Sequence, residues 1–285
     1  MTAHVATLLV ACPDRKGIVA SLAQLLYGHG ANILDSDQHS DPVEGQFFQR
    51  IRFDLSSLLT DRHTLEAGIR EVAQRFSMDW RLEYGNRTKR VAVLVSKQEH
   101  CLYDLLVRYR AQELPCEIAM VVSNHQGAEP IAQHFGVAFH HLPVTPETKA
   151  AQEAAVIELC ERERIDLIVL ARYMQILSPE LVARFPSRII NIHHSFLPAF
   201  IGANPYRQAF TRGVKLIGAT SHYVTAELDQ GPIIEQGVIG CSHRDTVEDL
   251  VRKGRDVEKR VLAAAVRWHL EDRILVYAGK TVVFD

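Results

Sequence analysis

The sequence predicts an α/β protein with two domains, a ferredoxin-like βαββαβ unit followed by a larger Rossmann-like domain. Three observations lead to this prediction. The chain has 285 residues, which on ordinary domain sizes indicates two domains. Apolar residues make up 47% of it, enough to bury a sizeable core. Short β-branched apolar runs alternate with segments of helical periodicity, a pattern typical of α/β sheets.

Residues 1–85 are predicted to form the βαββαβ unit. The apolar run at 4–11 predicts a strand, and apolar residues at helical spacing over 16–27 predict a helix that Gly28 and Gly30 end. The elements that follow are strands at 31–39 and 46–55 around a turn at 41–45, a helix at 61–76 and a strand at 78–84. This order is a split βαβ arrangement.

A polar, poorly patterned stretch at 86–89 predicts a linker, and the second domain is predicted over 90–285. Alternating strands and helices there favour a sheet that binds ligands at the carboxyl ends of its strands. The predicted strands are 91–95, 118–122, 166–171, 189–193 and an antiparallel pair at 216–224 and 233–239. The predicted helices are 102–112, 147–164 and 246–270, and a short hairpin ends the chain.

Charge and cysteine content exclude several classes of function. The formal net charge is −2, and phosphate backbones need a clustered basic excess, so nucleic acid is not an expected partner. Five scattered cysteines without a C-x-x-C pair indicate reduced thiols and a cytoplasmic protein. No apolar run approaches the ~18 residues of a membrane span, and no signal peptide is indicated.

The histidines do not predict a metal site. None of the 14 histidines forms an H-E-x-x-H pair. His140 and His141 are adjacent, as are His193 and His194, and adjacent strand residues point to opposite faces. Ser195 follows the second pair and is interpreted as a cap or turn residue rather than a nucleophile. We therefore expect no metal.

One constellation predicts chemistry. Asn191 and His193 lie two apart at the end of a predicted buried strand, so they share one face. Asp229 stands 36 positions after His193 (229 − 193), in the turn before Gly231. An amide, an imidazole and a carboxylate together can polarise a carbonyl group and direct a nucleophile at it. Taken singly, each side chain has the alternative role of satisfying buried backbone groups or capping a turn.

The pattern N-I-H-x-S-x-L-P, followed by H-x-V-x-x-x-x-D-x-G-P-I-I, resembles the signature of the folate-dependent formyltransferase fold. Three separate blocks fit this family in the right order, at 170–178, 191–202 and 218–236. Pro198 and Gly202 predict an irregular loop within the second block. The resemblance implies a catalytic domain over nearly all of 90–285.

The resemblance also implies roles for individual residues. Asn191, His193 and Asp229 fall on the catalytic positions of the family: Asp229 would activate the nucleophile, while Asn191 and His193 stabilise the oxyanion. The residues implied to bind the folate substrate are Met174, Gln175, Ile176, Leu177, His222 and Gly231, and His222 is also expected to orient Asp229. No cofactor is expected.

The departures from the family pattern indicate the nucleophile. Family members that use a phosphate-bearing acceptor have a glycine-rich loop after the first strand, because unencumbered N–H groups bind anions. Here residues 96–100 contain no glycine, and Glu99 would repel a phosphate. Water is then the remaining nucleophile. The version of the signature with His194 and Phe196 resembles the deformylase subgroup, which hydrolyses 10-formyltetrahydrofolate to tetrahydrofolate and formate. His194 is left open between specificity and packing.

The N-terminal unit resembles an ACT domain at residues 12–19 and 30–33. This implies an amino-acid effector and a homo-oligomer, a dimer or a tetramer, because ACT units usually pair. Two alternatives stay open for the whole chain. One is a transferase with an amine acceptor, and the other is a non-catalytic sensor of folate or of an amino acid.

Overall fold

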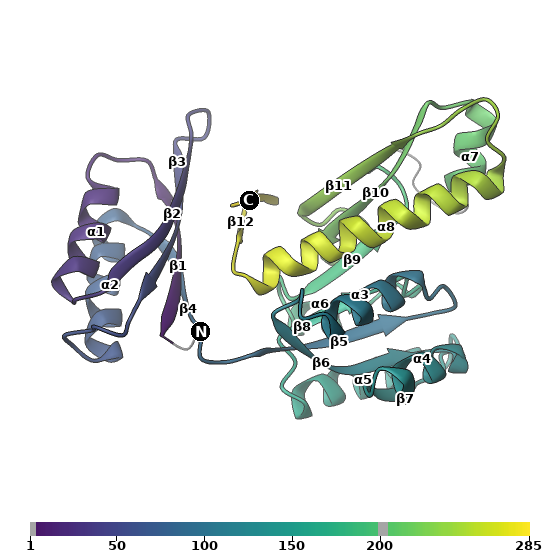
Figure 1. Cartoon of the computed structure of the whole chain (residues 1–285), viewed down its shortest axis with the longest axis horizontal. Coiled ribbons are helices and arrows are strands. Elements are labelled where there is room, and N and C mark those ends of the chain that lie inside the picture. The colour runs from purple at the N-terminus through teal and green to yellow at the C-terminus, as the bar shows by residue number, and fades with distance from the viewer. Residues whose placement is uncertain (1–3, 199–204) are drawn as a thin grey trace. The chain divides into compact units, whose positions relative to one another are not determined.

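The computed structural model describes residues 4–198 and 205–285 (Figure 1). The loop predicted around Gly202 lies outside these residues. The chain forms two compact units. The first unit runs up to Thr88 and takes in residues 272–285 as well, while the second unit comprises Lys89–Glu271.

The first unit has the predicted βαββαβ order. Its elements are β1 (Val5–Pro13), α1 (Ile18–Gly28), β2 (Asn32–Asp41), β3 (Gln46–Asp54), α2 (Arg62–Phe76) and β4 (Asp79–Tyr84). The strands form an antiparallel sheet in the order β2-β3-β1-β4. The Asp61 side chain begins α2 by accepting a hydrogen bond from the Thr64 backbone N–H.

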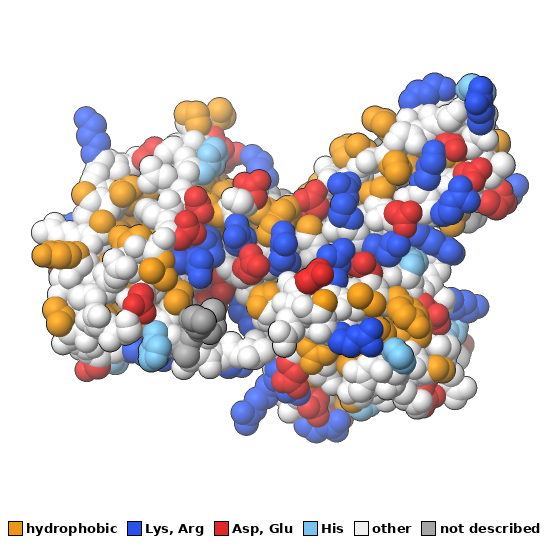
Figure 2. All heavy atoms as spheres, viewed as in Figure 1, with side chains coloured by type: hydrophobic (Ala, Val, Ile, Leu, Met, Phe, Trp, Pro, Cys, Tyr) orange, Lys and Arg blue, Asp and Glu red, His pale blue; other side chains and the backbone are white. Residues whose placement is uncertain are grey.

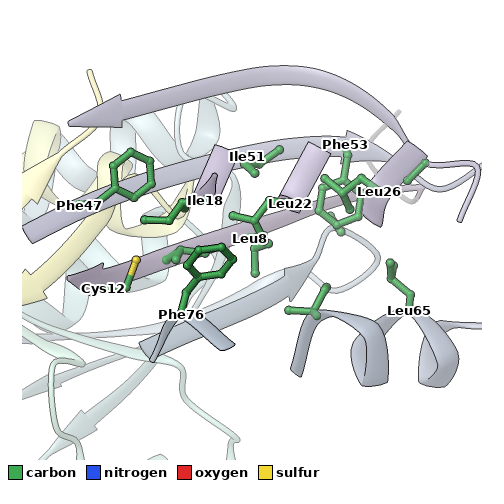
Figure 3. Close-up of a cluster of buried hydrophobic side chains, with 14 of the residues drawn as sticks. Leu8, Cys12, Ile18, Leu22, Leu26, Phe47, Ile51, Phe53, Leu65 and Phe76 are labelled. Atoms are coloured by element: carbon green, nitrogen blue, oxygen red, sulfur yellow. The ribbon is translucent and has the colours of Figure 1, made fainter. Parts of the chain in front are cut away.

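Strand alternation assigns the two faces of β1 to two different cores. Leu8, Val10 and Cys12 point toward the apolar stripes of α1 and α2, and Figure 3 shows Leu8 among the side chains of these helices and of β3. Leu9 faces the opposite side, where it packs with Phe48 and Phe284. β1 is therefore buried on both faces.

The opposite face of this sheet is covered by the end of the chain. β12 (Ile274–Tyr277) and β13 (Lys280–Val283) form an antiparallel hairpin whose apolar residues join the cluster of Leu9 and Phe48. The buried Arg50 guanidinium donates a hydrogen bond to the Asp272 carbonyl at 2.8 Å. The sequence placed residues 272–285 in the second domain, but these contacts make them part of the first unit.

The second unit is built on a seven-stranded sheet with the order β11-β10-β9-β8-β5-β6-β7. Its strands are β5 (Lys89–Val95), β6 (Cys116–Ser123), β7 (Ala138–His141), β8 (Leu167–Leu170), β9 (Ile189–His193), β10 (Leu216–Tyr223) and β11 (Ile233–Gly240). β5 to β9 pair in parallel, while β10 is antiparallel to both β9 and β11. The antiparallel pair predicted at the end of the sheet is confirmed.

The helices of the second unit connect and cover this sheet. They are α3 (His100–Arg110), α4 (Glu129–His134), α5 (Lys149–Arg162), α6 (Pro179–Arg184), α7 (Pro205–Arg212) and α8 (Val247–Leu270), with a 3₁₀ turn η1 (Gln126–Ala128). The short elements α4, β7, α6 and α7 were not expected from the sequence, because six to eight residues of helix or four of strand give too little periodicity.

The long helix α8 lies against β9, β10, β11 and α3. It begins with a capping box, in which Thr246 accepts from the Asp249 backbone N–H while Asp249 accepts from that of Thr246. Basic and acidic side chains are interspersed over α8 on the face that Figure 2 shows. No helix among the described residues is long and apolar enough to cross a membrane.

Candidate active site

A cavity of about 260 Å³ opens where β8, β9 and β10 meet. Parallel strands present their carboxyl ends at one edge, so the segment after β8 and the end of β9 reach the cavity together. β10 returns antiparallel and places His222 opposite Asn191. The lining residues are Leu170, residues 172–177, residues 191–194, His222 and residues 224–229.

The cavity brings together every residue that the resemblance marks except Gly231. Asn191, His193 and Asp229 line it with His222 and with all four residues of 174–177. Gly231 has a different role. A Cβ at Gly231 would lie 1.7 Å from the Tyr223 carbonyl oxygen, so this glycine lets two backbone segments approach closely.

His222 is a fixed, nearly buried ring. Its Nδ1 lies 2.9 Å from the Tyr223 carbonyl oxygen, which can only accept, so Nδ1 carries the proton of that hydrogen bond. Its Nε2 lies 3.2 Å from the Asn191 side-chain nitrogen. One amide N–H of Asn191 and one carboxylate oxygen of Asp229, 3.7 Å away, thus both face this Nε2. The other N–H of the Asn191 amide is available to a ligand in the cavity.

His193 and Asp229 form the central pair. His193 Nδ1 lies 3.2 Å from one carboxylate oxygen of Asp229, and His222 Nε2 lies 3.7 Å from the other. The His193 Nε2 atom is buried and has no hydrogen-bond partner among the described residues. A buried nitrogen without a partner lowers the stability of a protein, so such an atom needs an explanation. Contact with a bound substrate is one.

Asp229 is held as a carboxylate. Hydrogen bonds to His193 and then to His222 outweigh burial and hold the pKa of the Asp229 carboxyl far below its ordinary value. The residue has φ of 56°, a left-handed conformation that Asp tolerates better than most residues. This turn carries the carboxylate back toward both rings.

The segment after β8 forms one wall of the cavity. The Met174 and Ile176 side chains are 58% and 59% exposed, which is unusual for large apolar groups and suits a surface that a flat ring covers. The Met174 backbone N–H donates to the Ser96 hydroxyl, which in turn donates to Asn124. These hydrogen bonds tie the wall to the ends of β5 and β6.

Strand alternation predicts that the His194 side chain points away from that of His193. The structure shows that it does not. β9 ends at His193, so the alternation stops there, and both rings line the cavity. Their centroids lie 5.2 Å apart with 40° between the planes. The sequence-based interpretation of this pair was wrong because it applied strand alternation to His194, which lies beyond the end of the strand.

A buried polar network in the second unit was missed by the sequence analysis. Glu258 on α8 is 1% exposed. It accepts from the Tyr206 hydroxyl at 2.5 Å, pairs with His100 Nε2 at 2.7 Å and lies 3.6 Å from Arg172 Nε. Burial raises the pKa of Glu258, but the His100 hydrogen bond and the Arg172 charge outweigh it, and the net direction is downward. The sequence feature that could have indicated this network is Glu258, a single glutamate among the apolar positions of α8.

This network has the chemistry of an ion-pair cluster rather than of a metal centre. His100, Cys101 and Glu258 offer ligand atoms within 4.8 Å of one another. Burial and the Glu258 charge raise the pKa of the Cys101 thiol, so it stays protonated and is a poor ligand. Both Glu258 oxygens already have partners, and the Arg172 cation beside them disfavours a second cation.

Comparison with known proteins places both units in families. The Formyl transferase family model matches residues 89–266, and the ACT domain model matches residues 6–76. A formyltetrahydrofolate deformylase of Synechocystis sp. is 53% identical over 279 residues, 98% of either chain. One of Bacillus subtilis is 50% identical over 98% of this chain and 93% of its own.

A solved structure agrees with these relatives. The crystal structure of a formyltetrahydrofolate deformylase from Pseudomonas syringae superposes with a TM-score of 0.95 at 49% identity, over 99% of this chain and 95% of that one. The agreement spans both units. The chain therefore belongs to the formyltetrahydrofolate deformylase family, with an ACT domain ahead of a formyl transferase domain.

Proposed function

We propose that this protein hydrolyses 10-formyltetrahydrofolate to tetrahydrofolate and formate. The observation that carries the proposal is the cluster of Asn191, His193, His222 and Asp229 on one cavity wall, in a chain whose relatives are named for this reaction. The exposed apolar side chains of Met174 and Ile176 lie beside it and suit the pterin ring.

The reaction follows from the hydrogen bonds. Water attacks the formyl carbon, a C–O bond forms, and the carbonyl electron pair moves onto oxygen. The free Asn191 N–H and a proton on His193 Nε2 stabilise that oxyanion, and the Asp229 carboxylate favours the imidazolium. The Asp229 carboxylate takes the proton that water loses, and this proton passes on to N10. The oxyanion re-forms the carbonyl group as the C–N10 bond breaks with its electron pair on N10. Tetrahydrofolate and formic acid leave, and the acid releases its proton to solvent to give formate.

Turnover without an acceptor tests this function. Purified protein mixed with 10-formyltetrahydrofolate alone is expected to release tetrahydrofolate, followed by absorbance, and formate in equal amounts. The His193→Ala variant should lose turnover by at least about 10²-fold while keeping its affinity for tetrahydrofolate. Turnover only after an amine is added would show a transferase, and folate binding without turnover would show a sensor.

We further propose that the ACT domain binds an amino acid that shifts this activity, and that the chain forms an even-numbered homo-oligomer. A match of the ACT model over residues 6–76 supports both. Titration with small amino acids, methionine and glycine first, is expected to change the hydrolysis rate. Light scattering is expected to give the mass of a dimer or a tetramer. A rate unchanged by every amino acid would reduce the domain to an assembly element.

A further inference from the structure

His194 is a cavity residue that the mechanism above does not use. It lines the cavity beside His193, and it makes no hydrogen bond to any residue that the structure describes. The His193 ring centroid is 5.2 Å away. The two rings are therefore neighbours on the lining of one cavity, within reach of the same water molecule.

The surroundings of His194 keep its ring neutral. Burial, the Arg172 charge and the His193 charge together lower its pKa from 6.5 to about 4. A neutral imidazole has one nitrogen with a lone pair, and that nitrogen accepts a hydrogen bond. An imidazolium has none. Near neutral pH the His194 ring is therefore a hydrogen-bond acceptor in the cavity.

The buried network behind His194 supplies both the charge and the position. The Tyr206 ring centroid lies 6.2 Å from that of His194, and the Tyr206 hydroxyl is held by Glu258 at 2.5 Å. Glu258 in turn lies 3.6 Å from Arg172 Nε. Gly254 leaves room for Tyr206, since a Cβ there would lie 2.1 Å from its hydroxyl oxygen.

We propose that the His194 imidazole accepts a hydrogen bond from the attacking water and so sets the direction of its attack. This inference rests on the hydrolysis proposed above. Water brings two protons to the site. The Asp229–His193 pair takes one of them as the C–O bond forms, and neutral His194 holds the other without removing it. With both protons directed at protein groups, a water lone pair faces the formyl carbon.

His194→Leu tests the proposal, because leucine fills similar space and accepts no hydrogen bond. We expect kcat for hydrolysis to fall by about 10²-fold, with KM and the affinity for tetrahydrofolate little changed. The His194→Gln variant restores an acceptor and should recover part of the lost rate. The matched control is His243→Leu, the same change at an exposed histidine outside the site, which should keep the parent rate.

Hydroxylamine as a second nucleophile separates water orientation from general damage. It attacks the formyl carbon through nitrogen and yields tetrahydrofolate and formohydroxamate, and it is a stronger nucleophile than water. His194→Leu should retain far more of this reaction than of hydrolysis. Equal losses of both reactions, or hydrolysis by His194→Leu within about threefold of the parent, would overturn the role of His194. A parent protein that does not hydrolyse the substrate would instead overturn the proposed function.

Discussion

At the scale of single residues, the two carboxylate oxygens of Asp229 face two different histidines. One oxygen lies 3.2 Å from His193 and the other 3.7 Å from His222, and His222 is itself anchored to the Tyr223 carbonyl. The carboxylate is thus held between two imidazole rings that line the cavity.

Asp229→Asn keeps the shape of the side chain and removes its charge. We expect hydrolysis to fall by at least about 10²-fold, because the imidazolium form of His193 loses its counter-charge. Tetrahydrofolate binding, measured by fluorescence, should stay close to that of the parent. Asp256→Asn is the control, since Asp256 is 67% exposed. Strong hydrolysis by Asp229→Asn would contradict this role.

His194 predicts a pH effect on stability. Its pKa in the folded protein, about 4, lies below its ordinary value of 6.5. Between these two values the unfolded chain binds a proton that the folded protein does not, so the free energy of unfolding falls as the pH falls through this window. The contribution is at most about 1.4 kcal/mol per pH unit.

In His194→Asn this slope should become shallower, because asparagine does not titrate. The measurement is urea unfolding followed by Trp268 fluorescence in a Trp80→Phe background, because the two tryptophans of the chain lie in different units. An unchanged slope would show that His194 is protonated equally in both states.

The sequence predicted that the candidate site residues lie together where strand pairing decides their positions. Asn191, His193 and His222 come from adjacent strands, so sheet pairing alone brings them together. His194, Arg172 and Tyr206 could not be assigned in the same way. Their positions depend on where β9 ends, on a left-handed backbone at Arg172 with φ of 63°, and on a short helix that the periodicity did not reveal.

At the scale of elements, α8 begins at the capping box of Thr246 and Asp249, packs on the seven-stranded sheet and carries Glu258 of the buried network. Its length and period were evident from the sequence, and the predicted range of 246–270 differs from the observed helix by one residue. Its partner α7 was not predicted, so the reason for Gly254 in the middle of α8 stayed hidden. A helical glycine costs about 1 kcal/mol relative to alanine, and here it accommodates the Tyr206 ring.

Gly254→Ala should therefore destabilise the protein although alanine favours helices. The new methyl group displaces Tyr206 and removes its hydrogen bond to buried Glu258, and together these effects cost about 2 to 4 kcal/mol. Trp268 fluorescence in urea, in a Trp80→Phe background, measures the loss. Gly28→Ala is the matched control, because Gly28 is also helical and a Cβ there would have nothing within 4 Å, so it should be neutral or slightly stabilising. Gly28 lies in the first unit, so this control is followed by Trp80 fluorescence in a Trp268→Phe background. Equal effects at both glycines would rule out this explanation.

At the scale of the whole molecule, the chain leaves the first unit and returns to it. The sequence did not predict the return, because a short apolar hairpin at 274–283 fits equally well on either unit by composition. The structure places it on the open face of the ACT sheet, over Leu9 and Phe48. Tertiary packing, and not the local sequence pattern, therefore determines which unit the hairpin joins.

Phe284→Ala tests the role of this cover. Phe284 is 5% exposed, and its loss should destabilise the first unit by about 3 kcal/mol. Trp80 fluorescence in a Trp268→Phe background should report the change, while the Trp268 signal in a Trp80→Phe background should not. Val276→Ala on the same hairpin is the control, since that side chain is 38% exposed. A loss seen only by Trp268 would contradict the division into units.

The return of the chain gives the ACT unit two covalent connections to the catalytic unit instead of one. The first enters at the start of β5, and the second leaves at the end of α8, the helix that bears Glu258. A circular permutant opened within the 85–88 segment would cut one connection and spare the other. Comparing its response to an amino acid with that of the uncut chain would reveal which of the two conveys the signal.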